Sequence, residues 1–173
     1  VAAFTQGDAK ARKILAEQRA LKTDGRYQQS KIAPLLGDIA WDQLTPYNKM
    51  CPKYIGSSQS ATGCVATAMA QVMMYYQYPK ELKATIPAYT TTTNKLKIKA
   101  ISKGEKYDWE HMLPTYTQGK YNTTQANAVA KLMFHCGAAV QMDYGDSSGA
   151  WVLPEDMSTY FGYDADLLQE VYR

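Results

Sequence analysis

The run 60–76 reads as a short polar loop followed by a helix that is apolar on nearly every face. Several of its apolar residues follow the i, i+3, i+4 spacing of one helix face: Ala66, Met69, Ala70, Met73 and Tyr76. Other apolar side chains occupy the remaining faces, a pattern typical of a buried central helix. We expect Thr62 to cap this helix, Cys64 to lie in its first turn and Pro79 to end it.

Weaker patterns predict the elements around this helix. They are an amphipathic helix over 9–23, strands over 90–93 and 96–100, a helix over 123–136 capped by Thr123 or Thr124 and stopped by Gly137, a strand over 139–144, and a short helix from Pro154 to Phe161 closed by Gly162. Lysines alternate with apolar residues over 95–99, which is typical of an edge strand that lysines protect. We interpret this segment as a solvated hairpin without a function of its own.

The charge of the chain is unevenly distributed. Residues 1–33 carry seven Lys or Arg and three acidic residues, whereas the remaining 140 carry twelve and thirteen. The body is therefore nearly neutral, which predicts no nucleic-acid partner, and no apolar run is long enough to span a membrane. Residues 1–30 differ from the rest in charge and pattern. They form either an appendage (a prosegment remnant or linker helix) or the first helix of the domain, which we place over 31–173.

Cys64 is the candidate for a reactive nucleophile. The free amides of a helix's first turn and the helix dipole favour a thiolate, and the small residues Ala61, Gly63 and Ala66 leave space above the sulfur. The pattern alone also allows a cysteine that only fills the core. The chain has three cysteines, so at least one is a free thiol. No Cys-x-x-Cys or Cys/His cluster is present, so we expect no metal site.

Four segments together resemble one family. They are Trp41-Asp42-Gln43 with Pro46-Tyr47-Asn48 and Cys51-Pro52; Ala61 to Gln71 with Tyr75-Tyr76 and Tyr78-Pro79; Tyr107-Asp108-Trp109 with Met112-Leu113-Pro114; and Met142 to Gly145 with Ser147-Ser148-Gly149, then Tyr160 to Tyr163. In this order they resemble the streptopain family of secreted bacterial cysteine peptidases, which includes the interpain-type enzymes. The resemblance covers roughly residues 33–165.

The resemblance implies an α+β, papain-like fold, of which this chain holds mainly the helical half. It implies that Cys64 is the nucleophile and that the Gln43 amide completes an oxyanion hole with the Cys64 N–H. Ser148, Gly149 and Ala150 match the segment that lines the substrate cleft. The implied reaction is thiolate attack on a peptide carbonyl, with an acyl-enzyme intermediate and no cofactor. The implied partners are a polypeptide substrate and, since the family is made as zymogens, a propeptide.

The general-base histidine of the family, in a Gly-Gly-His-Ala context, has no counterpart in this chain. We interpret His111 and His135 as structural or surface residues. The base is then expected from a second chain or a C-terminal segment. Two alternatives remain: a non-catalytic binding or regulatory fragment, and a cysteine acyltransferase that uses His135.

Overall fold

The computed structural model describes residues 33–168. The predicted helix over 9–23 and the predicted domain boundary near residue 30 lie outside these residues. The described elements are, in order, β1 (Lys53–Ile55), β2 (Ser58–Gln59), α2 (Cys64–Tyr76), β3 (Tyr89–Thr90), β4 (Lys97–Ile98), η1 (Trp109–His111), α3 (Thr123–Ala139), α4 (Pro154–Phe161) and η2 (Ala165–Leu167). Helices predominate, and the strands form two short antiparallel pairs, β1–β2 and β3–β4.

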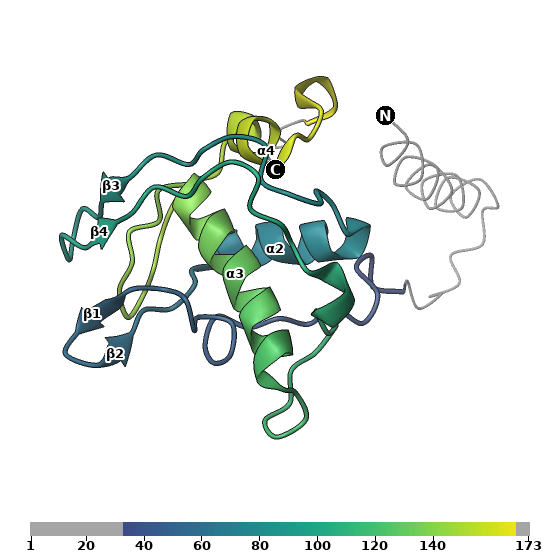
Figure 1. Cartoon of the computed structure of the whole chain (residues 1–173), viewed down its shortest axis with the longest axis horizontal. Helices are drawn as coiled ribbons and strands as arrows, with labels where there is room; N and C mark the ends of the chain where they lie inside the picture. Colours follow the sequence, from purple (N-terminus) through teal and green to yellow (C-terminus); the bar gives the residue numbers. More distant parts are fainter. Residues whose placement is uncertain (1–32, 169–173) are drawn as a thin grey trace, which may run out of the picture. The chain divides into compact units, whose positions relative to one another are not determined.

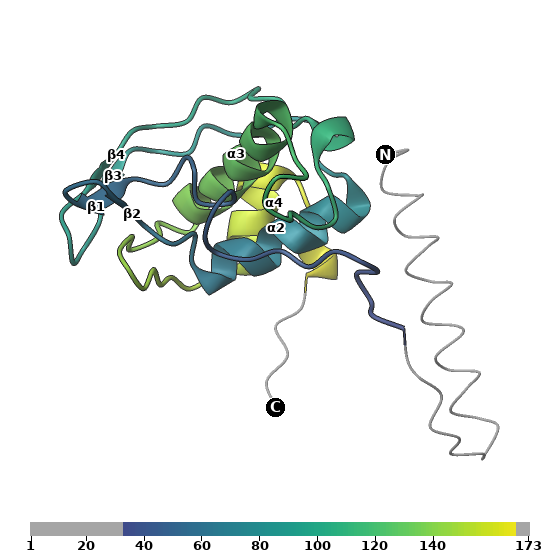
Figure 2. The ribbon, with the colours of Figure 1, turned by 90° about the horizontal axis from the view of Figure 1, so that it is seen from below.

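Helices α2 and α3 cross in the middle of the described fold and pack against each other (Figure 1, Figure 2). Fully buried side chains join them, among them Met73 from α2 and Leu132 from α3. The Sγ of Cys136 on α3 lies 3.6 Å from the Sδ of Met73. This crossing holds one face of α2 in the core.

The other face of α2 is only partly covered by the described residues, so the expectation of a helix buried all round needs correction. Cys64, Ala68 and Tyr76 are exposed, and Val72 and Tyr75 are only half-buried. These positions recur every three or four residues, so they form one strip along the helix. We call it the open strip of α2; it is apolar and it begins at Cys64.

Two predicted boundaries of α3 were wrong. The N-cap is Asn122, whose side chain accepts from the Gln125 N–H while the Gln125 side chain accepts from the Asn122 N–H, rather than Thr123 or Thr124. The helix also runs through Gly137 to Ala139. Gly137 is needed for packing, because a Cβ there would collide with the Tyr144 hydroxyl.

The predicted strand over 139–144 is also absent. The end of α3 occupies its start, and Gln141 turns the chain with a φ of 50°. Only one isolated bridge follows, between Asp143 and Gly149. By contrast, α4 begins at Pro154 and ends before Gly162, which has a φ of 71°, as predicted.

Residues 80–106 form the predicted hairpin. Its strands β3 and β4 are shorter than the predicted 90–93 and 96–100, but backbone pairing continues beyond them. Beyond β3 and β4, backbone hydrogen bonds join Leu82 to Glu105 at 2.9 Å and Ile86 to Ile101 at 2.9 and 3.0 Å. The buried side chains Leu82, Ile86, Ile98 and Ile101 face the core. None of the described helices is long and apolar enough to cross a membrane.

Candidate active site

Cys64 is the first residue of α2, and its side chain is exposed. Gly63 precedes it with φ 88° and ψ 143°, a conformation that residues with a Cβ rarely adopt. This turn sends the Thr62 side chain into the interior, where its hydroxyl lies 2.9 Å from the Thr67 hydroxyl. The prediction that Thr62 caps the helix was therefore wrong, and no side chain caps α2. The first amides of α2 remain available beside the thiol.

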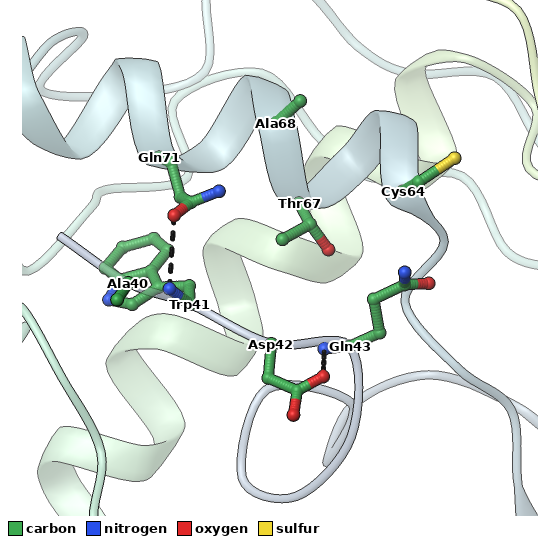
Figure 3. Close-up of a pocket in the computed structure, with 8 residues that line it drawn as sticks. All are labelled: Ala40, Trp41, Asp42, Gln43, Cys64, Thr67, Ala68 and Gln71. Carbon is green, nitrogen blue, oxygen red and sulfur yellow. Dashed lines mark hydrogen bonds between the residues drawn. The ribbon is translucent and has the colours of Figure 1, made fainter. Parts of the chain in front are cut away.

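Gln43 and Cys64 line the same open hollow (Figure 3). Figure 3 shows the Gln43 amide below the first turn of α2, on the same side as Cys64. The backbone holds the two segments together, because the Thr62 N–H donates to the Gln43 carbonyl at 3.0 Å. The Asp42 carboxylate accepts from the Gln43 N–H.

The hollow has further walls that the resemblance did not indicate. They are Ala40, Trp41, Asp42, Thr67, Ala68 and Gln71. The Gln71 side chain accepts from the Trp41 N–H at 3.1 Å, so α2 anchors the loop that carries Gln43. Gln71 lies seven residues after Cys64, and this helical spacing is the signal that could have identified it.

The segment Ser148–Ala150 lies beside the residues that precede Cys64. A Cβ added to Gly63 would lie 3.2 Å from the Ser148 carbonyl oxygen. The buried Ser148 hydroxyl donates to the Ala61 carbonyl at 2.8 Å and accepts from the Gly145 N–H at 3.0 Å. It therefore braces the loop before the cysteine, whereas Gly149 is exposed with open space above its Cα.

Neither histidine belongs to the hollow. His135 is buried on α3, and its Nδ1 is hydrogen-bonded to the Tyr107 hydroxyl at 3.1 Å. Burial, with a smaller effect from Lys131, lowers the pKa of His135 to about 4. His111 is exposed, and its Nδ1 lies 2.8 Å from the Asp108 carboxylate. The structure places both away from the residues that line the hollow.

The other two thiols are buried, and all three cysteines are free. Burial raises the pKa of Cys51 to about 12 and raises that of Cys136 as well. Cys64 is thus the accessible thiol of the three. Within residues 33–168, no three His, Cys, Asp or Glu side chains gather in a way that could hold a metal ion.

The sequence model of the peptidase C10 family matches residues 41–172. Streptopain of Streptococcus pyogenes is 39% identical over an alignment of 130 residues that covers 65% of this chain and 31% of streptopain. The thiol protease/hemagglutinin PrtT of Porphyromonas gingivalis is 31% identical over 146 residues, 80% of this chain and 16% of that protein.

Two solved structures of Prevotella intermedia proteins are similar in fold. Active wild-type interpain A cysteine protease matches with a TM-score of 0.63 and 38% identity, over 72% of this chain and 53% of that one. A prointerpain A fragment matches with a TM-score of 0.65 and 31% identity, over 92% of this chain and 55% of that one. The chain thus spans about a third of streptopain and about half of these solved chains.

Proposed function

This chain belongs to the peptidase C10 family, and we propose from that membership that it is the cysteine-bearing part of a cysteine endopeptidase. Its fold is α+β and papain-like, and the described residues are mainly the helical half. The Cys64 thiolate attacks a peptide carbonyl to give a tetrahedral adduct, the C–N bond breaks so that the protonated amine leaves and an acyl-enzyme thioester remains, and water then cleaves the thioester to release the acid and the thiol.

One observation carries this proposal: the exposed thiol begins a helix and shares its hollow with a glutamine amide. The Cys64 N–H and the Gln43 side-chain amide are the two donors for the oxyanion that forms during attack. Preorganised donors of this kind stabilise the transition state strongly, because they need no rearrangement as the charge develops.

The segment Ser148–Ala150 supplies the substrate contact. The Ser148 hydroxyl already has a donor and an acceptor partner within the protein. The substrate is therefore held by the backbone of the segment and by its exposed part at Gly149, with Ser148 as a positioning residue.

The general base comes from a polypeptide segment outside this chain, either a second chain or a C-terminal segment. The burial and low pKa of His135 argue against the acyltransferase alternative, because this side chain is committed to Tyr107. The open strip of α2 supports the proposal, since among the described residues it is a partly exposed, mainly apolar surface that starts at the nucleophile. The histidine-bearing segment packs on that strip.

Residues 1–30 are the remnant of a prosegment, and the enzyme is secreted as a zymogen. The matched share of the chain rises from 72% against active interpain A to 92% against the prointerpain A fragment, which supports this assignment. N-terminal mass spectrometry before and after activation tests it. Retention of Val1 in fully active enzyme would contradict it.

Alkylation kinetics test the catalytic proposal. The chain is treated with iodoacetamide and with a peptidyl epoxide, alone and together with the histidine-bearing polypeptide, and the labelled cysteine is mapped. We expect Cys64 to react ahead of Cys51 and Cys136, and to accelerate when the histidine is supplied. If Cys64 reacts no faster than a simple thiol in the presence of that polypeptide, the chain is a non-catalytic fragment and the proposal fails.

A further inference from the structure

The hairpin 80–106 concentrates positive charge. It carries seven lysines and two glutamates, a net charge of +5. Residues 107–168 carry two lysines and eight acidic residues, a net charge of −6. The nearly neutral body expected from the sequence is therefore divided into a basic hairpin and an acidic remainder.

The fold turns most of these lysines toward solvent. Lys97 and Lys99 flank the buried Ile98 and are exposed, as alternation about that residue requires, and Lys103 is exposed in the turn that follows Ile101. Lys97 and Lys99 are two residues apart on extended backbone, so they stand about 6.6 Å apart along the chain. The tip of the hairpin projects beyond the helices (Figure 1). The exposed lysines are thus concentrated on a hairpin whose two strands are paired with each other.

Few of the lysines are neutralised by carboxylates. Glu105 is held by Lys131 of α3 at 2.6 Å, and Glu81 lies 3.9 Å from Lys83. Six exposed lysines form no ion pair with another described residue: Lys80, Lys95, Lys97, Lys99, Lys103 and Lys106. We call these six residues the lysine ridge. Asp143 lies near its tip, where Thr93 binds the carboxylate at 2.7 and 3.0 Å.

The composition of the ridge indicates its occupant. Lysine ammonium groups act as point charges and lack the planar guanidinium with which arginine binds one carboxylate or phosphate in a bidentate way. They therefore suit a polymer whose negative charges are spread along its length. The exposed hydroxyls of Thr90, Thr92 and Ser102 accompany them and can hydrogen-bond sugar hydroxyls. No large apolar side chain of the hairpin is exposed, which disfavours insertion into a membrane. Its tyrosine, Tyr89, is half-buried with its hydroxyl donated to the Met142 carbonyl at 2.9 Å, which disfavours base stacking.

We propose that the lysine ridge binds a linear acidic polysaccharide and holds the protein on a polyanionic surface or matrix. This binding is separate from the hollow at Cys64 and does not depend on the proposed peptidase activity. It replaces the interpretation of the hairpin as solvated and without function.

The test compares two variants that lose the same charge. The ridge variant carries Lys97→Gln, Lys99→Gln and Lys103→Gln. The control variant carries K49Q, K53Q and K120Q at three exposed lysines outside the hairpin. Both keep the basic residues 1–33, and circular dichroism and thermal unfolding establish that both are folded.

Binding of the whole chain is measured by fluorescence anisotropy with labelled heparin and labelled hyaluronate across a salt series. We expect the ridge variant to bind at least about tenfold more weakly at low salt, and to lower the slope of log Kd against log salt by about 2. The control variant should stay within about twofold of the parent chain, because its lysines lie outside the ridge.

Three outcomes would overturn the proposal. Equal loss in both variants would mean that binding follows net charge alone. Tighter binding to duplex DNA or to phosphatidylglycerol vesicles than to either polysaccharide would assign the ridge to another ligand. Unchanged polysaccharide affinity together with self-association of the ridge variant would mean that the lysines only protect the hairpin edges.

Discussion

The Gly63→Ala substitution tests how the turn before the nucleophile is held. Gly63 has φ 88° and ψ 143°, and a Cβ there would lie 2.5 Å from both the Cε and the Sδ of Met142. Met142 is fully buried, so its end has little room to move. The Ser148 carbonyl oxygen lies 3.2 Å from the same Cβ position, and this residue is held in place because its hydroxyl donates to the Ala61 carbonyl.

Two separate costs add in this variant. Holding a residue with a Cβ in a backbone region that glycine dominates costs about 1–3 kcal/mol. Forcing an extra methyl into a packed core costs about 1–3 kcal/mol more. We therefore expect the free energy of unfolding to fall by roughly 2–6 kcal/mol, a large part of a typical domain's stability.

Urea denaturation measures this loss, and Gly104→Ala is the matched control. Gly104 has the same φ of 88°, but nothing lies within 4 Å of its Cβ position. It should therefore show the backbone cost alone, about 1–3 kcal/mol. Epoxide labelling of Cys64 in folded Gly63→Ala protein should also slow, because the turn presents the thiol.

A double-mutant cycle with Met142→Ala isolates the collision. Removing the thioether costs about 2–5 kcal/mol by itself, because it leaves a cavity. In the double variant the alanine methyl at position 63 has space. The loss of unfolding free energy in the double variant should therefore be about 1–3 kcal/mol smaller than the sum of the losses in the two single variants. If Gly63→Ala costs no more than Gly104→Ala, and the cycle shows no coupling, then the contact with Met142 does not constrain the turn.

Three further predictions concern the brace, the buried histidine and the oxyanion donor. Ser148→Ala should lower the free energy of unfolding by about 2–4 kcal/mol in urea denaturation, since it strips buried backbone groups of a partner, while Ser147→Ala at the exposed neighbour should stay within about 0.5 kcal/mol. Because the pKa of His135 is lowered to about 4, the unfolded chain binds a proton between pH 6.5 and 4 that the folded chain does not. The free energy of unfolding should therefore fall by up to about 3 kcal/mol as the pH falls through that window. Urea midpoints measured across the window should depend less on pH in a variant of His135, whereas a variant of exposed His111 should behave like the parent chain. Gln43→Ala should lower the turnover of the complete enzyme by about a hundredfold or more while the nucleophile is still alkylated at the parent rate, and an unchanged turnover would remove the glutamine from the oxyanion hole.

The sequence correctly predicted the helix ends that are set by the backbone preference of a single residue. Pro154 begins α4 because its fixed φ suits a first helical turn, and Gly162 ends it because glycine accepts a positive φ. Cys64 was expected in the first turn of a helix, and it is the first residue of α2. The assignment of the chain to its family also followed from short motifs in order.

The errors arose where a residue that is typical of a helix end instead makes a packing contact or a buried hydrogen bond. Gly137 has the form of a helix stop, but it lies inside α3 because Tyr144 needs the space of its missing side chain. Thr62 has the form of a helix cap, but its hydroxyl lies buried against Thr67. Both partners lie within a few residues along the chain, but the local pattern does not show that they turn inward to make these contacts.

The pattern of residues was enough to predict α2, α3 and α4, to place Cys64 at the start of α2, and to show that this chain has no Gly-Gly-His-Ala motif. Tertiary structure alone decided which thiol stays accessible, which face of α2 stays open, and that the Ser148 hydroxyl points inward. The reason is physical: backbone preferences act over a few residues, whereas burial, desolvation and surface charge depend on segments that are far apart in the chain.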